Sequence, residues 1–423
     1  MRRPRRGGVA ALAVIPLSLL ALFGYFIATF EGPLLPGDVA PPAPAPAIRL
    51  SDADTQRLGW DPRGLDAAFG YTAGLSSDTL MIVTEGETVA AFGDLEKPRH
   101  LHSIRKAVLS ALVGQHAGTG GQQIPLTATL AELGIDDRPQ PLTALQSQAT
   151  VLHLLKSLSG INHAAAAEEG LLAEKKRRLG EGENPPGTIW AYNNWDTNAL
   201  TTIFEARTGL SVAEAFATGI AEPLGLRDHR AGAITYIAAP ALSQHRAAMF
   251  HMSARDLARF GALYLNKGVV DGTQVLPAAW IERIAVDFTE TGNAGLRQGH
   301  GYLWWVPGPG TDLPKGTFWA WGFGQQALFV VPEWRSVIVH QADTDELLKR
   351  FFSLVRDKKL NPETAIGQLA FSCLEPNDGS IEFCAEHRLI LRREFAELIS
   401  LIAAARLGQE ESQSSSAAWR TRE

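Results

Sequence analysis

The sequence predicts an α+β fold in which one antiparallel sheet is built from N- and C-terminal strands and is flanked by helices. Strand-like runs at 80–93 and after residue 300 enclose a middle region, about 107–290, whose pattern is mostly helical. The chain has 423 residues, of which 45% are hydrophobic and 20% charged, so it can bury a substantial core. A helical subdomain is therefore expected between the two halves of the sheet.

The individual elements follow from the spacing of apolar residues. The run at 80–93 contains two apolar stretches around Glu85-Gly86-Glu87, which is typical of a hairpin. Helical periodicity is expected at 102–116, 150–159, 195–208, 212–220, 253–266 and 277–285. Later strands, separated by Pro and Gly, are expected at 301–306, 317–321, 326–331 and 335–341.

The N-terminus carries a membrane-directed segment. Residues 9–30 contain no charge and follow four arginines, so residues 1–30 are predicted to be a signal-anchor or a signal peptide. An anchor would make a single-pass protein of the cell inner membrane, with the folded domain on the periplasmic side. A cleaved signal peptide would instead release the protein into the periplasm. The Pro/Ala-rich stretch 31–50 is predicted to be an extended linker.

The rest of the chain is predicted to form one large domain and a C-terminal extension. Residues 51–343 form the domain, 344–408 a mainly helical extension, and 409–423 a disordered tail. The only cysteines, Cys373 and Cys384, flank a turn signal and could form a disulfide in an exported protein. The alternative is a pair of reduced, buried thiols.

Charge and residue spacing argue against several classes of partner. The net charge is −6, and no basic helix accompanies it, so nucleic acid is not an expected partner. His100 and His102 could suggest a metal pair, but no third ligand follows at a useful spacing, and no cofactor is expected. The basic run at 175–178 is expected to be a solvated surface.

The first candidate for chemistry is Ser103 with Lys106, at the start of the helix expected over 102–116. Residues three apart lie on one face of a helix, so Lys106 can reach the Ser103 oxygen and help to remove its proton. The alternative is a helix-capping serine before an ordinary surface lysine. The pair alone does not decide between these.

The second candidate is Tyr192 with Asn194, where a loop enters the helix expected over 195–208. A phenol whose pKa is lowered by a nearby ammonium can serve as a general base. An asparagine amide can hold both a lysine and a substrate carbonyl group. The alternative is a helix start that happens to be rich in asparagine.

The third candidate is the strand segment Gly322-Phe323-Gly324. Glycine lets a backbone approach a ligand closely, and a backbone N–H from this segment could join that of Ser103 in stabilising an oxyanion. The alternative is a glycine-rich bulge between two hydrophobic strands. Four tryptophans could wall an apolar pocket nearby, although such clusters more often pack a core: Trp304, Trp305, Trp319 and Trp321.

Taken together, these three segments resemble the motifs of the penicillin-recognising serine hydrolases, a beta-lactamase-related family. The closest similarity is to class C beta-lactamases and to 6-aminohexanoate-dimer-hydrolase-like esterases and amidases. The resemblance spans about residues 55–342. The matching stretches are Ser-x-x-Lys at 103–106, Tyr-x-Asn at 192–194 and Gly-x-Gly at 322–324, supported by 150–160, 251–261 and 301–305.

The resemblance implies a beta-lactamase/transpeptidase-like fold and hydrolysis through an acyl-enzyme. Ser103 would be the acylated nucleophile, Lys106 and Tyr192 would share the proton transfers, and Asn194 would position lysine and substrate. The third motif departs from the family's Lys-Thr-Gly, because Ala320-Trp321-Gly322 carries no cation. That lysine helps to bind carboxylates, so a neutral ester or amide is the expected substrate.

Two other functions remain open from the sequence. One is a beta-lactamase or a D-Ala-D-Ala carboxypeptidase-like enzyme, which the missing lysine disfavours. The other is a non-catalytic binding protein of the cell envelope on the same fold. Intact Ser103, Lys106 and Tyr192 favour the enzyme, acting on a small-molecule or peptide ester or amide.

Overall fold

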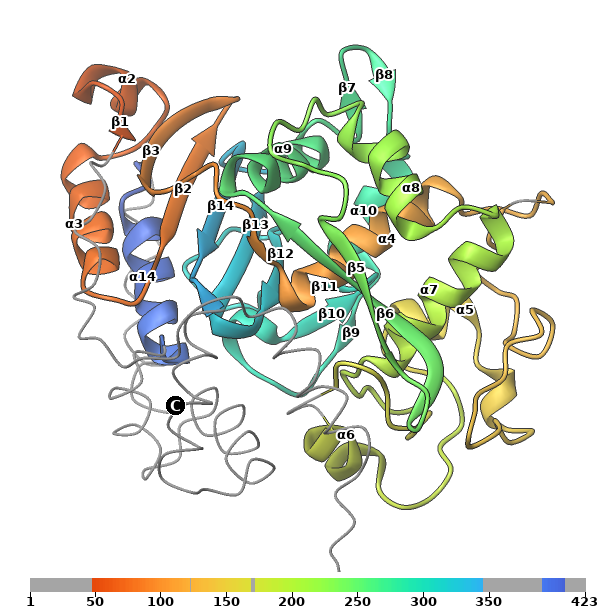
Figure 1. Cartoon of the computed structure of the whole chain (residues 1–423). Coiled ribbons are helices and arrows are strands. Elements are labelled where there is room, and N and C mark those ends of the chain that lie inside the picture. The colour runs from red at the N-terminus through yellow and green to blue at the C-terminus, as the bar shows by residue number, and fades with distance from the viewer. Residues whose placement is uncertain (1–47, 122, 169–171, 345–389, 408–423) are drawn as a thin grey trace, which may run out of the picture. The chain divides into compact units, whose positions relative to one another are not determined.

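A nine-stranded antiparallel sheet forms the centre of the computed structural model, which describes residues 48–121, 123–168, 172–344 and 390–407. The N-terminal strand β2 pairs with the C-terminal strand β14, so both ends of the domain contribute to one sheet (Figure 1). The predicted α+β class, with a sheet built from both ends and flanked by helices, is confirmed. The strands in spatial order are β1 Ile48–Arg49, β3 Glu87–Gly93, β2 Thr79–Thr84, β14 Ser336–Gln341, β13 Gln326–Val331, β12 Phe318–Gly322, β11 Trp304–Val306, β10 Gly299–Gly301 and β9 Thr289–Glu290.

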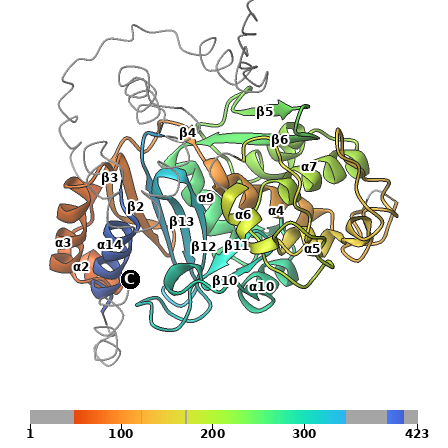
Figure 2. The same ribbon diagram turned by 90° about the horizontal axis from the view of Figure 1, so that it is seen from below.

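The central strands are buried on both faces because each face packs against helices. Successive side chains of a strand point to opposite faces, and β13 follows this alternation. Leu328 and Val330 belong to the core that includes α9, whereas Phe329 and Val331 belong to the core that includes α14. Figure 2 shows α3 and α14 on one side of the sheet and α9 and α4 on the other.

The helices predicted at 102–116, 195–208 and 253–266 lie close to their expected bounds, whereas the helix at 62–73 was not predicted. The stretch predicted at 195–208 is α7, with the same bounds. The stretch predicted at 150–159 ends early, at Leu155, because Ser157 and Gly160 adopt positive φ angles of 55° and 73° that a helix cannot continue. The described α-helices are α2 Asp52–Arg57, α3 Pro62–Ala73, α4 Arg105–Gln115, α5 Val151–Leu155, α6 Leu172–Leu179, α7 Trp195–Thr208, α8 Val212–Phe216, α9 Ala254–Leu265, α10 Ala278–Val286 and α14 Arg392–Ala404.

The middle region is not all helical, because it contains a long hairpin. β5 Ile234–Ala239 and β6 Ser243–Met252 pair with each other, and β6 also pairs with β4 Arg99–His100. Polar residues occupy inward positions of β6: Ser243 and His245 are each about 1% exposed. Because these buried positions are polar, the sequence of β6 lacks the alternation of apolar and polar residues that indicates a strand. A further short hairpin is formed by β7 Val269–Val270 and β8 Thr273–Gln274.

The predicted membrane attachment requires correction. Across the described ranges no helix is long and apolar enough to cross a membrane. The longest described helix, α7, has 14 residues, whereas a span needs about 20. The predicted anchor or signal segment, 1–30, lies outside the described residues. Attachment through an N-terminal transmembrane helix and a single-pass inner-membrane location are therefore not retained.

Other predictions fall wholly or partly on residues that the structure does not describe. Cys373, Cys384 and the tail 409–423 lie outside the described ranges. Of the predicted extension, Thr344 and residues 390–407 are described, and the latter include the helix α14. Of the predicted linker, the last residues are described, and Ile48–Arg49 form β1 against β3.

Candidate active site

Ser103 lies in a short turn that joins β4 to α4. The turn is a 3-10 helix, η1 His102–Ile104, and His102 before the serine has a φ of 47°, which few residues other than glycine adopt. Lys106, in the first turn of α4, is 1% exposed, and its Nζ donates a hydrogen bond to Ser103 Oγ at 3.1 Å. The predicted contact between these side chains is thus present.

Asn194 completes the surroundings of the lysine. It stands at the N-cap of α7, and its Oδ1 accepts a hydrogen bond from Lys106 Nζ. Its Nδ2 donates to the backbone carbonyl of Ala167, which fixes the orientation of the amide. The amide oxygen of Asn194 therefore faces Lys106.

Burial changes the protonation of Lys106. Burial is the largest cause that lowers the pKa of Lys106 well below its usual value, and the nearby charge of Arg105 adds to it. The carboxylate of Glu168 opposes this shift. A lysine with a lowered pKa is neutral over more of the working pH range and can accept a proton.

Tyr192 contacts both members of this pair. Lys106 Nζ lies 4.6 Å from the centroid of the phenol ring, and the phenol forms a hydrogen bond with Ser103. Burial raises the pKa of Tyr192 to about 12, although Ser103 and the charge of Arg105 act in the opposite direction. The sequence predicted a lowered pKa, and desolvation of the buried ring reverses it. Tyr192 is consequently a neutral phenol, able to donate its proton.

The Gly322-Phe323-Gly324 segment lies against the serine turn. A Cβ atom on Gly322, the last residue of β12, would stand 2.6 Å from the carbonyl oxygen of Leu101, so only glycine permits this approach. Gly324 has a φ of 75°, and the Phe323 ring lies 5.5 Å from the His102 ring. The fold thus brings all three predicted segments together. The role of their backbone N–H groups stays a prediction.

The buried ion pair of Glu168 and Lys175 contacts the backbone of Asn194. Glu168 Oε1 accepts a hydrogen bond from the backbone N of Asn194 at 3.3 Å and from Lys175 Nζ at 2.7 Å. Lys175 is fully buried and also donates to the carbonyl of His163. The expectation of a solvated basic run at 175–178 is therefore wrong for Lys175.

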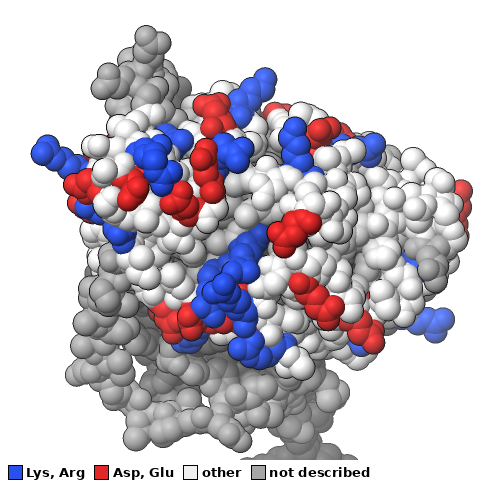
Figure 3. Space-filling view, turned by 90° about the horizontal axis from the view of Figure 1, so that it is seen from above, with Lys and Arg blue, Asp and Glu red and all other residues white. Residues whose placement is uncertain are grey.

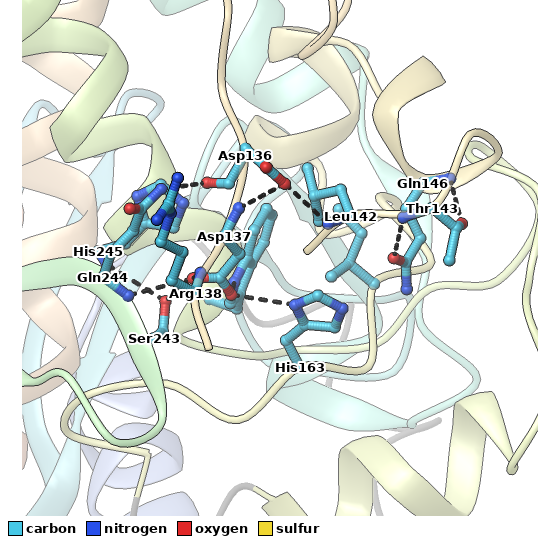
Figure 4. A network of polar contacts seen from close by, with 12 residues as sticks. Asp136, Asp137, Arg138, Leu142, Thr143, Gln146, His163, Ser243, Gln244 and His245 are labelled. Atoms are coloured by element: carbon cyan, nitrogen blue, oxygen red, sulfur yellow. Dashed lines mark hydrogen bonds and ion pairs between the residues drawn. The ribbon is translucent and has the colours of Figure 1, made fainter. Parts of the chain in front are cut away.

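Asp137 is a second buried carboxylate. It connects the loop that contains His163 with α7 and with β6. It accepts hydrogen bonds from His163 at 3.0 Å and from Ser243 at 2.8 Å (Figure 4). The indole N–H of Trp195 also donates to it, at 2.6 Å. Burial would raise the pKa of Asp137, but these bonds and one from the backbone of Gln244 lower it to about 2. Asp137 is therefore ionised at neutral pH, and its bond with Trp195 holds the start of α7 next to Asn194.

Several site residues could not be recognised from the sequence. Glu168 and His300 stand in no motif, and Arg105 and Lys175 resemble ordinary surface cations. His300 is fully buried, its ring lies 5.5 Å from that of Tyr192, and burial lowers its pKa to about 3. The only sequence signal for Arg105 is its position inside the Ser-x-x-Lys tetrad.

The histidines before Ser103 form a cluster without metal-site geometry. His100 Nδ1 lies 3.2 Å from His102 Nε2, and His102 Nε2 lies 2.7 Å from Thr344 Oγ1. Burial lowers the pKa of His102 to about 3. Among the residues described, no group of three or more His, Cys, Asp or Glu side chains could hold a metal ion.

Several known proteins are similar to this chain. An uncharacterized protein of Alkalihalophilus pseudofirmus is 24% identical over 269 residues, which are 57% of this chain and 72% of that protein. The structure of a putative 6-aminohexanoate-dimer hydrolase from Bacillus anthracis aligns with 69% of this chain and 82% of the hydrolase chain, with 22% sequence identity and a TM-score of 0.49. The crystal structure of SurE aligns with 74% of this chain and 77% of the SurE chain, with 17% sequence identity and a TM-score of 0.50.

A family match covers most of the domain described above. The sequence model of the Beta-lactamase family matches residues 65–352, about two thirds of the chain. This stretch includes the serine turn, Lys106, Tyr192, Asn194 and the glycine segment of β12. The chain therefore belongs to the beta-lactamase family.

Proposed function

We propose that the protein is a serine hydrolase that cleaves ester or amide bonds through an acyl-enzyme on Ser103. The observation that carries the proposal is the hydrogen bond between Lys106 Nζ and Ser103 Oγ, 3.1 Å long, in a site that lowers the pKa of the lysine. A buried amine beside a hydroxyl is a general way to make a serine nucleophilic. Membership of the beta-lactamase family supports a hydrolase.

In the first step Ser103 Oγ attacks the carbonyl carbon of the substrate while its proton passes to the neutral Lys106. The carbonyl oxygen becomes an oxyanion, which the backbone N–H of Ser103 and one from Gly322–Gly324 would stabilise. When the carbon–oxygen or carbon–nitrogen bond breaks, the leaving group takes the phenol proton of Tyr192. Lys106 then returns its proton to Tyr192 directly or through Ser103.

In the second step a water molecule replaces the leaving group. Its proton passes through the same pair, its oxygen attacks the acyl carbon, and Ser103 Oγ leaves with a proton. Asn194 keeps Lys106 in place in both steps because its amide oxygen accepts from the ammonium or amine. The two steps together release an acid and an alcohol or amine.

The experiment uses a fluorophosphonate probe and nitrophenyl acetate, with the intact mass of the protein as the first readout. We expect one adduct on Ser103 and ester turnover, and Ser103→Ala should lose both. Lys106→Ala should slow acylation by about 10²- to 10⁴-fold, the usual contribution of general base catalysis. Ser147→Ala, which removes a hydroxyl that donates to the carbonyl of Ala144, is the matched control.

Two outcomes would overturn this proposal. An unmodified mass with every acyl donor and no ester turnover would favour a binding protein on the same fold. A rapid cleavage of nitrocefin that depends on Ser103, with negligible ester turnover, would favour a beta-lactamase.

A further inference from the structure

The carboxylate of Glu168 lies next to Asn194, and the steps described above give it no role. Glu168 is 5% exposed, and its Oε1 accepts hydrogen bonds from the backbone N of Asn194 at 3.3 Å and from Lys175 Nζ at 2.7 Å. Among the described residues, its Oε2 is buried without a hydrogen-bond partner. A carboxylate oxygen in this state lowers stability. The bond to Asn194 needs only an acceptor, which an uncharged amide would also supply, so it does not explain the negative charge.

Asn194 connects Glu168 with Lys106. Its amide oxygen accepts a hydrogen bond from Lys106 Nζ, and its amide nitrogen donates to the carbonyl of Ala167, the residue before Glu168. The backbone N of the same asparagine donates to Glu168 itself. Glu168 and Lys106 therefore contact one residue, and two neighbouring residues of the loop hold that residue in place.

Glu168 acts on Lys106 in the direction opposite to Arg105. Arg105, which is 3% exposed, adds to the effect of burial in lowering the pKa of Lys106, whereas the charge of Glu168 raises it. Burial lowers the pKa of His300 to about 3 and raises the pKa of Tyr192 to about 12, so both of these neighbours are uncharged near neutral pH. Glu168 is thus a carboxylate whose charge favours the ammonium form of Lys106.

Two further charged or titratable groups act close to Glu168. Lys175 is fully buried and forms the ion pair with its carboxylate. Asp196 lies in the first turn of α7, and burial raises its pKa to about 7. The charge of Glu168 adds to this increase, whereas the charge of Lys175 opposes it. A test of Glu168 by pH must therefore separate its effect on Lys106 from its effect on Asp196.

We propose that Glu168 is a positioning residue that holds Asn194 and stabilises the ammonium of Lys106 when the lysine takes the proton of Ser103. In that step the O–H bond of Ser103 breaks and an N–H bond forms at the lone pair of Lys106. The electron pair left on Oγ forms the bond to the carbonyl carbon. An anion near the new ammonium stabilises this state more than the state with a neutral amine. This inference rests on the proposed function and adds to it a residue from outside the three motifs.

The experiment measures kcat/KM of the full chain for nitrophenyl acetate as a function of pH. The acid limb of this profile reports the loss of a proton from Lys106 in the free enzyme. Glu168→Gln keeps an oxygen acceptor but removes the charge that raises the pKa of Lys106. The acid limb should therefore move to lower pH by about 1 unit, the lower end of the effect of a nearby opposite charge. The value above the limb should fall, and Glu168→Asp should recover part of the shift.

Three further variants serve as controls. Glu183→Gln removes the same charge from an exposed position in the loop before α7 and should keep the wild-type acid limb. In Asp196→Asn, which cannot titrate at that position, the additional change Glu168→Gln should still move the limb to lower pH. Should Glu168→Gln alone fail to fold, the double variant with Lys175→Met leaves neither charge of the ion pair buried without a partner. It should show the same direction of shift.

The outcomes separate this inference from the proposed function. If the wild type turns over no ester and the fluorophosphonate leaves Ser103 unmodified, the proposed function itself fails. If the wild type is active, but Glu168→Gln or the double variant only lowers the rate and leaves the acid limb in place, Glu168 supports the fold alone and the inference is wrong. A shift that disappears in Asp196→Asn would belong to Asp196 and would also contradict it.

Discussion

At the scale of single residues, burial determines which groups hold protons. Lys106 and His300 are buried, and burial lowers the pKa of each. Burial raises the pKa of Tyr192 to about 12. All three groups are therefore displaced toward their neutral forms, as desolvation requires. A neutral amine can accept a proton and a neutral phenol can donate one, which are the roles proposed for Lys106 and Tyr192 beside Ser103.

A buried carboxylic acid near the site predicts a pH dependence of stability. Burial raises the pKa of Asp196 to about 7 from 3.8, despite a hydrogen bond of 2.6 Å from Ser159. Between these values the folded protein keeps a proton that the unfolded chain releases. The free energy of unfolding should therefore fall as pH rises from about 4 to about 7, by at most about 4 kcal/mol from this group.

The measurement is the Tm at pH values of about 5 and about 8. Asp196→Asn cannot titrate, so its Tm should fall less between these conditions than that of the wild type. Asp271→Asn, an exposed change in the turn between β7 and β8, should keep the wild-type difference. Equal pH dependence in wild type and Asp196→Asn would show that Asp196 does not titrate in this range.

At the scale of elements, the site depends on how a loop is held against α7. Residues 161–168 contribute the carbonyl of Ala167 and the carboxylate of Glu168, both of which contact Asn194. Asp137 holds the same loop through His163 (Figure 4). It holds α7 through Trp195. The position of Asn194 therefore follows from long-range hydrogen bonds to its neighbours.

Asp137→Asn tests this support. The change removes a buried anion and leaves at least one of its N–H donors without an acceptor, so we expect a loss of about 3 to 5 kcal/mol in the free energy of unfolding. The acylation rate of Ser103 should fall as well, because α7 and Asn194 lose their fixed position. Denaturant unfolding and fluorophosphonate labelling measure the two effects.

The neighbouring Asp136 provides a matched control. It is exposed and accepts hydrogen bonds from the backbone N of Leu142 and of Asp137 (Figure 4). Asp136→Asn should cost far less stability than Asp137→Asn. Similar losses in the two variants would mean that the buried network does not position the site.

At the scale of the whole molecule, the C-terminal helix α14 completes one side of the sheet. Phe395 is 2% exposed, and its ring stacks 6.2 Å from Trp319 of β12 and 6.3 Å from Phe329 of β13. β12 is the strand that ends at Gly322 beside the serine turn. The extension therefore packs against the back of the candidate site.

Phe395→Ala should remove this packing and leave a cavity behind β12. We expect a loss of about 3 to 5 kcal/mol in the free energy of unfolding, the usual cost of truncating a buried phenylalanine. Arg393→Ala, an exposed change on the same helix, should stay within about 0.5 kcal/mol of the wild type. A small effect of Phe395→Ala in urea unfolding would show that α14 is not part of the cooperative core.

The surface of the molecule carries no strong bias of charge on the face drawn in Figure 3, where acidic side chains lie among basic ones and much of the area is uncharged. This distribution agrees with the modest net charge of −6.

Local rules explain what the sequence alone determined. The short apolar runs of β13 and β14, the periodicity of α7 and the spacing of Ser103 and Lys106 depend on residues close in sequence, so the strands, the helix and the pair were predictable. Only the tertiary structure decided the rest. The contacts of Glu168 with Asn194 and of His300 with Tyr192 join segments far apart in the chain. The pKa values of Lys106 and Tyr192 depend on burial, which no local pattern records.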